Sequence, residues 1–277
     1  MKLLEGTSIA AEMKAALKKR LESMDHRPRL AIVIVGENPV SKKFVALKER
    51  FAGEIGVETR RYELAADLTT SQLRARMKDI VHEARNDGVV VQLPMPPDID
   101  TQAVLNAVTP EKDVDVLSAR SVGDFQVGKS KILPPVAGAV DELFKAYGID
   151  IEGRHVVVLG YGRLVGQPLA TWFMQKKAFV TVIGDEKQFD QKIVSAADIV
   201  VSGMGQPNFI KGDMIREGAI VLDVGTSEVA GEMVGDVDFE SVKNKAAYLT
   251  PIKGGVGPLT VALIFRNLLI LNGILKS

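Results

Sequence analysis

The feature that most constrains the fold is a regular alternation of short apolar runs with longer segments of helical spacing. The runs are rich in valine and isoleucine and several end at glycine, which is typical of buried strands. The expected strands are residues 29–36, 57–64, 89–97 (ending in a proline-rich loop), 155–160, 179–184, 198–203 and 219–225. Strands that alternate with helices form parallel sheets covered by helices. We therefore expect an α/β fold.

The expected helices fall into two series, which predict two domains. They cover residues 7–24, 38–56, 69–88, 137–149 and a final apolar stretch, 261–275. The segment 123–138 between the two series is rich in glycine and proline, so we place the domain boundary there. The first domain is predicted at 1–136 and is completed by a C-terminal helix, 258–277. The second, at 137–257, is predicted to be Rossmann-like.

Composition excludes several functions. Lysine and arginine number 35, aspartate and glutamate also 35, and there is no cysteine. The chain therefore has no excess positive charge that would favour binding to nucleic acid or to an anionic membrane. Zinc sites and nucleophiles built on cysteine are excluded. No apolar run is long enough to span a membrane, so a cytoplasmic protein is expected. His26, His82 and His155 are expected to be solvated or packed, and no metal site is expected.

The segment HVVVLGYGRLVGQPLA predicts a dinucleotide site. It places Gly160, Gly162 and Gly166 between a strand and a helix, where glycine permits a tight turn and the helix N-terminus presents N–H groups to a pyrophosphate. The spacing is one residue longer than the common fingerprint, and an unliganded domain of the same fold is the alternative. The candidate cofactor-binding residues are Gly160, Tyr161, Gly162, Val165, Gly166, Asp185, Gly225 and Thr226.

Asp185 follows the next expected strand, at the position that often selects between the two nicotinamide cofactors. Its carboxylate suits the ribose 2′-hydroxyl of NAD and would repel a 2′-phosphate. Lys187 lies two residues away and would partly offset that repulsion. A solvated loop carboxylate is an equally good interpretation of Asp185.

Several long segments, in this order along the chain, carry a resemblance to one family. They are VGENPVSKKFVALK, VVVQLPMPP, PEKDVDVLS, HVVVLGYGRLVGQPLA, IKGDMIREGAIVLDVG, MVGDVDFESV and TPIKGGVGPLT. The chain resembles, over nearly its whole length, the bifunctional methylenetetrahydrofolate dehydrogenase/methenyltetrahydrofolate cyclohydrolase family. The resemblance implies two α/β domains flanking a cleft, with folate bound mainly by the first and a nicotinamide cofactor by the second. It also implies a homodimer.

The resemblance also implies which residues do the chemistry. Lys48 matches the lysine of the family's Tyr-x-x-x-Lys motif, and Phe44 stands where the tyrosine is usual. Gln92 matches the glutamine that orients the lysine. Asp115 matches a carboxylate that holds the pterin, with Asp113 as the nearby alternative. The two motif positions are four residues apart, so both side chains share one face of a helix.

By the same resemblance, the turn at 254–260 lies close to folate. Its candidate substrate-binding residues are Gly255, Pro258 and Thr260, beside Phe44, Lys48, Gln92 and Asp115. The sequence departs from the family's usual residues at several places. These departures are Phe44, Val116, Val136, Ala137, Tyr161 and Lys253.

The expected reactions make different demands on these residues. Oxidation of 5,10-methylenetetrahydrofolate requires the reacting carbon to be aligned with the nicotinamide, and no proton acceptor. Hydrolysis of the methenyl product to 10-formyltetrahydrofolate requires a general acid/base, and a buried Lys48 fits this role. The missing hydroxyl at Phe44 would weaken this second reaction.

The resemblance favours NADP+, whereas Tyr161 and Asp185 slightly favour NAD+. The alternative functions are a dehydrogenase with little cyclohydrolase activity and a noncatalytic folate- or nucleotide-binding paralogue with a regulatory role.

Overall fold

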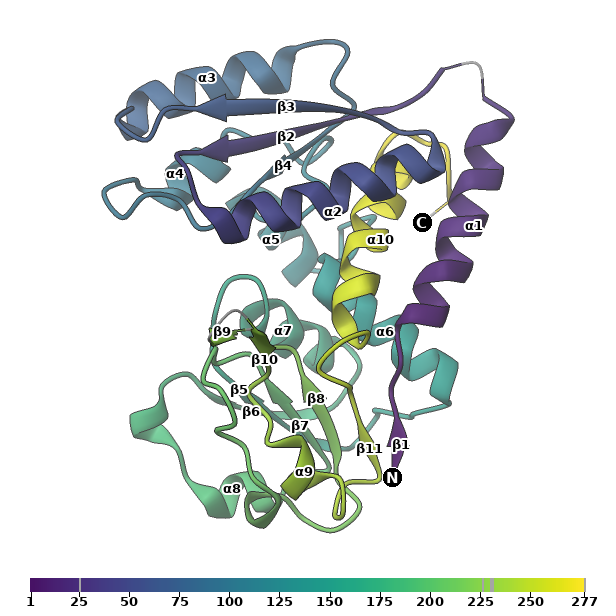
Figure 1. The fold of residues 1–277 in the computed structure, drawn as a ribbon, viewed down its shortest axis with the longest axis vertical. Helices are drawn as coiled ribbons and strands as arrows, with labels where there is room; N and C mark the ends of the chain where they lie inside the picture. The colour runs from purple at the N-terminus through teal and green to yellow at the C-terminus, as the bar shows by residue number, and fades with distance from the viewer. Residues whose placement is uncertain (25, 226, 230–231, 277) are drawn as a thin grey trace. The chain divides into compact units, whose positions relative to one another are not determined.

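The structure is a computed structural model that describes residues 1–277 apart from 25, 226, 230–231 and 277 (Figure 1). The chain forms two compact units. The three-stranded unit comprises Ala11–Pro135 and Val261–Ser277, and the six-stranded unit comprises Met1–Ala10 and Val136–Thr260.

The three-stranded unit has a parallel sheet in the order β3-β2-β4. Its strands are β2 (Arg29–Val35), β3 (Glu58–Leu64) and β4 (Gly88–Val91), and its helices are α2 (Pro39–Ile55), α3 (Thr70–His82), α4 (Thr101–Leu105) and α5 (Ala119–Gln126). Alternate residues of β2 enter two different cores, because side chains along a strand point to opposite faces. Ile32 packs in the core with Val45 of α2, and Val33 in the core with Met77 of α3. Helices therefore cover both faces of this sheet (Figure 1).

Two further helices belong to both units. They are α1 (Thr7–Glu22) and α10 (Val256–Leu271). Within the three-stranded unit, Leu17 and Leu21 of α1 and Phe265 and Leu268 of α10 join the core that contains Ile32. The ring of Phe265 stacks on Phe51 of α2, with centroids 5.0 Å apart.

The six-stranded unit has a wholly parallel sheet in the order β1-β11-β8-β7-β5-β6. Its strands are β1 (Lys2–Leu3), β5 (His155–Leu159), β6 (Phe179–Ile183), β7 (Ile199–Ser202), β8 (Ile220–Asp223) and β11 (Tyr248–Leu249). The helices of this unit are α6 (Pro135–Tyr147), α7 (Gly166–Gln175), α8 (Gln191–Ser195) and α9 (Phe239–Val242), with short 3₁₀ turns η1 (Glu186–Gln188) and η2 (Gly212–Met214). A hairpin of β9 (Ser227–Val229) and β10 (Glu232–Val234) completes it.

The strand order creates a switch point in the larger sheet. The chain passes from β5 to β6 on one side, and β7 then pairs with β5 on its other side. Loops that leave the carboxyl ends of β5 and β7 therefore run in opposite directions, and in such sheets this switch point is the usual ligand position.

The structure confirms the expected α/β class and corrects several boundaries. Residues 1–10 were predicted to lie in the first domain, yet they belong to the six-stranded unit, because the N–H of Lys2 donates to the carbonyl of Ala247 and that of Leu4 to Leu249. The strand predicted from residue 89 ends at Val91, and the last helix begins at Val256. The short strands β1 and β11 were not predicted.

Candidate active site

A buried lysine lies at the centre of the candidate site in the three-stranded unit. Lys48 of α2 is only 8% exposed, and its Nζ donates a hydrogen bond to Oε1 of Gln92 at 2.9 Å. Gln92 directly follows β4, and its backbone N–H donates to Val33. Its Nε2 donates to the carbonyl of Leu93 at 2.8 Å. The amide of Gln92 is therefore fixed with its oxygen toward the lysine.

The two candidate carboxylates have different environments. Asp113 is buried, and its carboxylate accepts hydrogen bonds from the backbone N–H groups of Leu117 and Ser118. It holds its own loop together. Asp115 interacts electrostatically with Lys48 and is the carboxylate that the fold brings to the lysine.

The electrostatics of the pair follow from burial. Desolvation lowers the pKa of Lys48 below its ordinary value, and the charge of Asp115 partly opposes this. Desolvation raises the pKa of Asp115 to about 6, with Lys48 acting in the opposite direction and Asp113 adding to the rise. A lysine whose charged form is disfavoured can exchange protons with a substrate closer to neutral pH.

Phe44 lies one turn before Lys48 on α2, as the spacing predicts. Its side chain is 36% exposed, which is high for a phenylalanine. The ring therefore offers an apolar surface beside the lysine without a hydroxyl.

A residue that the sequence did not single out supports the Asp115 loop. Asn267 of α10 is almost fully buried, and its Nδ2 donates to the carbonyl oxygens of Val114 and Leu133, both at 2.9 Å. The available signal was an amide next to Arg266 in a mainly apolar helical stretch. Val116, on the other side of Asp115, has a left-handed backbone with φ of 59°. Glycine suits this conformation better than valine.

The glycine-rich turn lies at the switch point of the larger sheet. Gly160 has φ of 86°, and a Cβ there would lie 2.6 Å from the carbonyl oxygen of Gly203 in the loop after β7. Gly166 begins α7 and packs directly on Gly160. By contrast, no atom lies within 4 Å of where a Cβ on Gly162 would be. Val165, the N-cap of α7, makes no side-chain cap hydrogen bond. The open space at Gly162 fits a pyrophosphate. The first turn of α7 offers few N–H groups to it, because that of Gln167 donates to the carbonyl of Gly162 and residue 168 is a proline.

The other predicted cofactor residues follow β5, β6 and β8. Tyr161 is 54% exposed, and Asp185 caps η1 by accepting the N–H of Lys187 at 2.8 Å. Gly225 follows β8, and a Cβ there would collide with the carboxylate of Asp236. Thr226 lies outside the described residues.

Two aspartates that the sequence analysis did not name as site residues, Asp223 and Asp236, are buried beside Gly235 and Gly225. For Asp223 the available signal was a carboxylate at the end of an apolar strand.

Close packing within the six-stranded unit explains the glycines of the turn at 254–260. Gly254 has φ of 88°, and its carbonyl accepts the N–H groups of Gly6 and Thr7. A Cβ on Gly6 would collide with the carbonyl of Gly255. Pro258 and Thr260 lie at the start of α10, where Thr260 Oγ1 donates to the carbonyl of Gly257. The roles of Gly255, Pro258 and Thr260 in substrate binding stay predictions.

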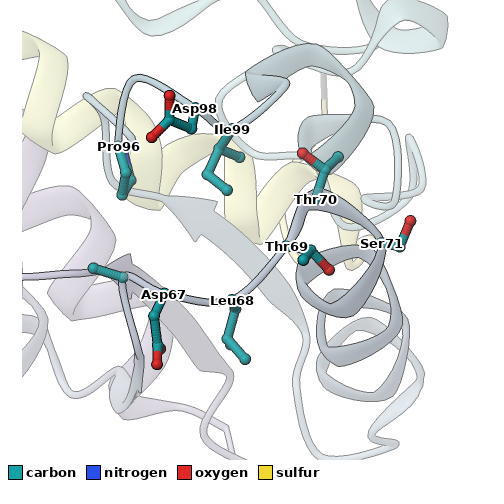
Figure 2. Close-up of a pocket in the computed structure, with 9 residues that line it drawn as sticks. Asp67, Leu68, Thr69, Thr70, Ser71, Pro96, Asp98 and Ile99 are labelled. Carbon is teal, nitrogen blue, oxygen red and sulfur yellow. The ribbon is translucent and has the colours of Figure 1, made fainter.

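A separate cavity of about 490 Å³ lies in the three-stranded unit (Figure 2). It is lined by Ala66, Asp67, Leu68, Thr69, Thr70, Ser71, Pro96, Asp98 and Ile99. None of the predicted site residues lines it. Thr69 there is the N-cap of α3 and forms a capping box with Gln72.

The histidines have local partners. His155 pairs with Thr181, His82 with the carbonyl of Lys78, and His26 with Arg85.

Among the described residues, no group of three or more histidine, cysteine or carboxylate side chains could hold a metal ion. Within the same part of the chain, no helix has the length and apolar character to cross a membrane.

The fold and the two sites define the class of protein: an α/β enzyme with a dinucleotide-type sheet and a second unit that holds a buried lysine. Family models match both parts of the chain. The catalytic domain of tetrahydrofolate dehydrogenase/cyclohydrolase matches residues 4–115, and its NAD(P)-binding domain matches residues 134–273. The chain belongs to the tetrahydrofolate dehydrogenase/cyclohydrolase family.

Individual relatives agree with this assignment. The bifunctional protein FolD of Campylobacter curvus is 37% identical over 271 residues, covering 96% of this chain and 94% of the relative. The crystal structure of the FolD enzyme of Campylobacter jejuni is 35% identical with a TM-score of 0.94, covering 99% of each chain. The Trypanosoma brucei FolD structure, complexed with NADP cofactor and inhibitor, is 37% identical with a TM-score of 0.90, covering 97% of this chain and 96% of that one. These findings confirm the expected family and its NAD(P)-binding domain.

Proposed function

We propose that the chain oxidises 5,10-methylenetetrahydrofolate to the methenyl form with NAD(P)+ and hydrolyses that product to 10-formyltetrahydrofolate. The observation that carries the proposal is the buried Lys48, held by Gln92 and close enough to Asp115 to interact electrostatically. A solvated helix lysine would be exposed and would need no such partners. Family membership supplies the substrate and both reactions.

In the hydrolysis, Lys48 handles the protons. Water adds to the methenyl carbon, and the neutral amine of Lys48 accepts a proton from it. The resulting ammonium donates a proton to the ring nitrogen as the carbon–nitrogen bond breaks, and one proton is released overall. Gln92 keeps the lysine in place by accepting a hydrogen bond from its amine. Asp115, ionised above about pH 6, accepts hydrogen bonds from the pterin.

In the oxidation, the chain mainly positions the substrate. The methylene carbon loses a hydride to the nicotinamide, which supplies the redox chemistry when bound. The open backbone at Gly162, between β5 and α7, would hold its pyrophosphate. No proton acceptor is needed in this step, so Phe44 can serve it as an apolar wall.

The cofactor preference rests on the charges near the adenosine ribose. Asp185 keeps a second carboxylate oxygen for a ribose hydroxyl, and Glu186 adds another negative charge. Lys187 and Arg163 are the nearby cations. We propose a slight preference for NAD+, because two carboxylates on η1 and its cap disfavour a 2′-phosphate. Cyclohydrolase activity is proposed to be weakened by the missing hydroxyl at Phe44.

A homodimer and a cytoplasmic location complete the proposal. Exposed apolar side chains on the edge strand β6 and on α7 support self-association, since Phe179 is 69% exposed and Met174 is 52% exposed. Light scattering coupled to size exclusion tests the dimer, and cell fractionation tests the location. The hydrogen-bonded pair of Lys48 and Gln92 favours a catalytic protein over a noncatalytic paralogue.

The test of the function is a spectroscopic assay of the purified protein with 5,10-methylenetetrahydrofolate and each cofactor in turn. We expect reduced nicotinamide to form with both, faster with NAD+, and methenyl absorbance then to decay faster than the uncatalysed rate. Failure to reduce either cofactor would overturn the proposal.

A further inference from the structure

A buried carboxylate organises the loop after β7. Asp236 has no exposed surface, and its Oδ2 accepts hydrogen bonds from Ser202 Oγ at 2.7 Å and from the N–H of Met204 at 2.8 Å. The same oxygen accepts the N–H of Gly205 at 3.2 Å, and Oδ1 accepts that of Gln206 at 2.8 Å. One side chain thus binds three successive backbone N–H groups. Such charge-assisted hydrogen bonds are strong and fix the loop's backbone.

A second carboxylate holds Asp236 itself in place. Asp223, the last residue of β8, accepts the backbone N–H groups of Asp236 and Val237, both at 3.0 Å. Glycines at 225 and 235 leave room for the two carboxylates, since a Cβ at either position would collide with one of them. The carboxyl end of β8, Asp236 and the loop at 203–206 are therefore connected by hydrogen bonds.

This loop faces the glycine-rich turn across the switch point. The carbonyl of Gly203 lies against Gly160, and Val165 packs on Gly203, where a Cβ would lie 2.9 Å from the Val165 Cβ. The loop also reaches the end of β6, because Nε2 of Gln206 donates to Glu186 at 2.6 Å. A shift of 203–206 would therefore disturb the turn after β5 and the residues expected at the ribose.

We infer that Asp236 is a positioning residue for the nicotinamide dinucleotide, holding residues 203–206 so that the switch point between the β5 and β7 loops fits the cofactor. This rests on the proposed function, in which that switch point takes NAD(P)+. Asp236 does not itself touch the cofactor, because its carboxylate is fully buried and bonded to the chain.

The test compares Asp236→Asn with Asp238→Asn, the same change two residues away at the half-buried N-cap of α9. An amide nitrogen cannot accept the N–H groups that one carboxylate oxygen now accepts. We expect KM for NAD+ and the calorimetric Kd for NAD+ to rise roughly tenfold or more in Asp236→Asn. Dehydrogenase kcat at saturating NAD+, KM for folate and methenyl hydrolysis should change by less than about twofold. Asp238→Asn should match the wild type in all of these.

A milder variant tests the inference if Asp236→Asn does not fold. Ser202→Ala removes one donor to Asp236 and should raise KM for NAD+ by roughly two- to tenfold, with hydrolysis retained. Unchanged NAD+ affinity in a folded Asp236→Asn, or in Ser202→Ala if the former does not fold, would overturn the inference. So would an equal loss of both activities. Wild-type protein that reduces neither NAD+ nor NADP+ would instead contradict the proposed function.

Discussion

Lys48 and Gln92 form a side-chain pair that joins α2 to the end of β4, with Nζ and Oε1 2.9 Å apart. The pair explains why a lysine lies on a buried helix face. The glutamine's carbonyl satisfies part of the amine's hydrogen bonding without adding a negative charge, so the neutral amine stays accessible. A carboxylate at residue 92 would instead favour the ammonium.

Asp115→Asn should stabilise the protein while lowering both activities. The pKa of Asp115 is raised to about 6 in the folded chain from an ordinary value of 3.8, so the ionised form is disfavoured by folding. Ionisation of Asp115 therefore lowers the free energy of unfolding as pH rises from about 4 to above 6, by at most about 3 kcal/mol.

The free energy of unfolding measured in urea checks this prediction. Asp115→Asn should exceed the wild type at pH 8, and the difference should shrink toward pH 4. A difference that does not depend on pH would show that burial of the carboxylate does not govern its ionisation.

Val116 is expected to carry backbone strain, since its φ of 59° is left-handed. At ordinary positions glycine is less stable than alanine by roughly 0.5–1 kcal/mol. Here the order should reverse. Both Val116→Gly and Val116→Ala lose the buried side chain, but only glycine relieves the strain, which costs about 1–2 kcal/mol. Chemical denaturation of the two variants compares them directly, and an alanine variant more stable than the glycine variant would contradict the strain.

Much of the fold could be predicted from the sequence, because buried parallel strands are short apolar runs. The strands β2, β5, β6, β7 and β8 fall within predicted ranges. The two-residue strands β1 and β11 could not be predicted. Their pairing joins Leu3 to Leu249, which are almost the whole chain apart, and no local sequence pattern indicates it.

The candidate site was predictable in residue type but not in arrangement. Asp113 and Asp115 have equivalent positions in the motif, and only the fold separates the loop-holding carboxylate from the one that meets Lys48. Asn267 and Asp236 act through backbone groups distant in sequence, so their contacts had no local signal.

Asp185→Ser should shift cofactor preference toward NADP+ by roughly tenfold in the ratio of kcat/KM values, because a negative charge near the 2′-phosphate is removed. Asp190→Ser is the matched control. Asp190 is also exposed and caps a short helix by accepting the N–H of the residue two positions later. A wild-type enzyme with strong NADP+ preference, or equal shifts in both variants, would show that Asp185 does not face the ribose.

Phe44→Tyr should raise cyclohydrolase turnover more than dehydrogenase turnover. A hydroxyl one turn from Lys48 adds a hydrogen bond to the proton-transfer site, which corresponds to a gain of roughly ten- to a hundredfold in kcat if it acts in the transition state. Hydride transfer needs only alignment. Phe179→Tyr, at an exposed position in the six-stranded unit, controls for the added hydroxyl. Equal changes in both activities, or none, would make Phe44 a packing residue.

The central claim is that Lys48 transfers protons in methenyl hydrolysis, and the hydrolysis rate of Lys48→Met tests it most directly. The measurement is made beside Lys42→Met, an exposed lysine on the same helix that pairs with Glu37. Folate binding is followed separately by calorimetry. We predict that hydrolysis by Lys48→Met falls to nearly the uncatalysed rate while folate binding stays detectable, and that Lys42→Met keeps wild-type hydrolysis. Wild-type hydrolysis by Lys48→Met would contradict the account.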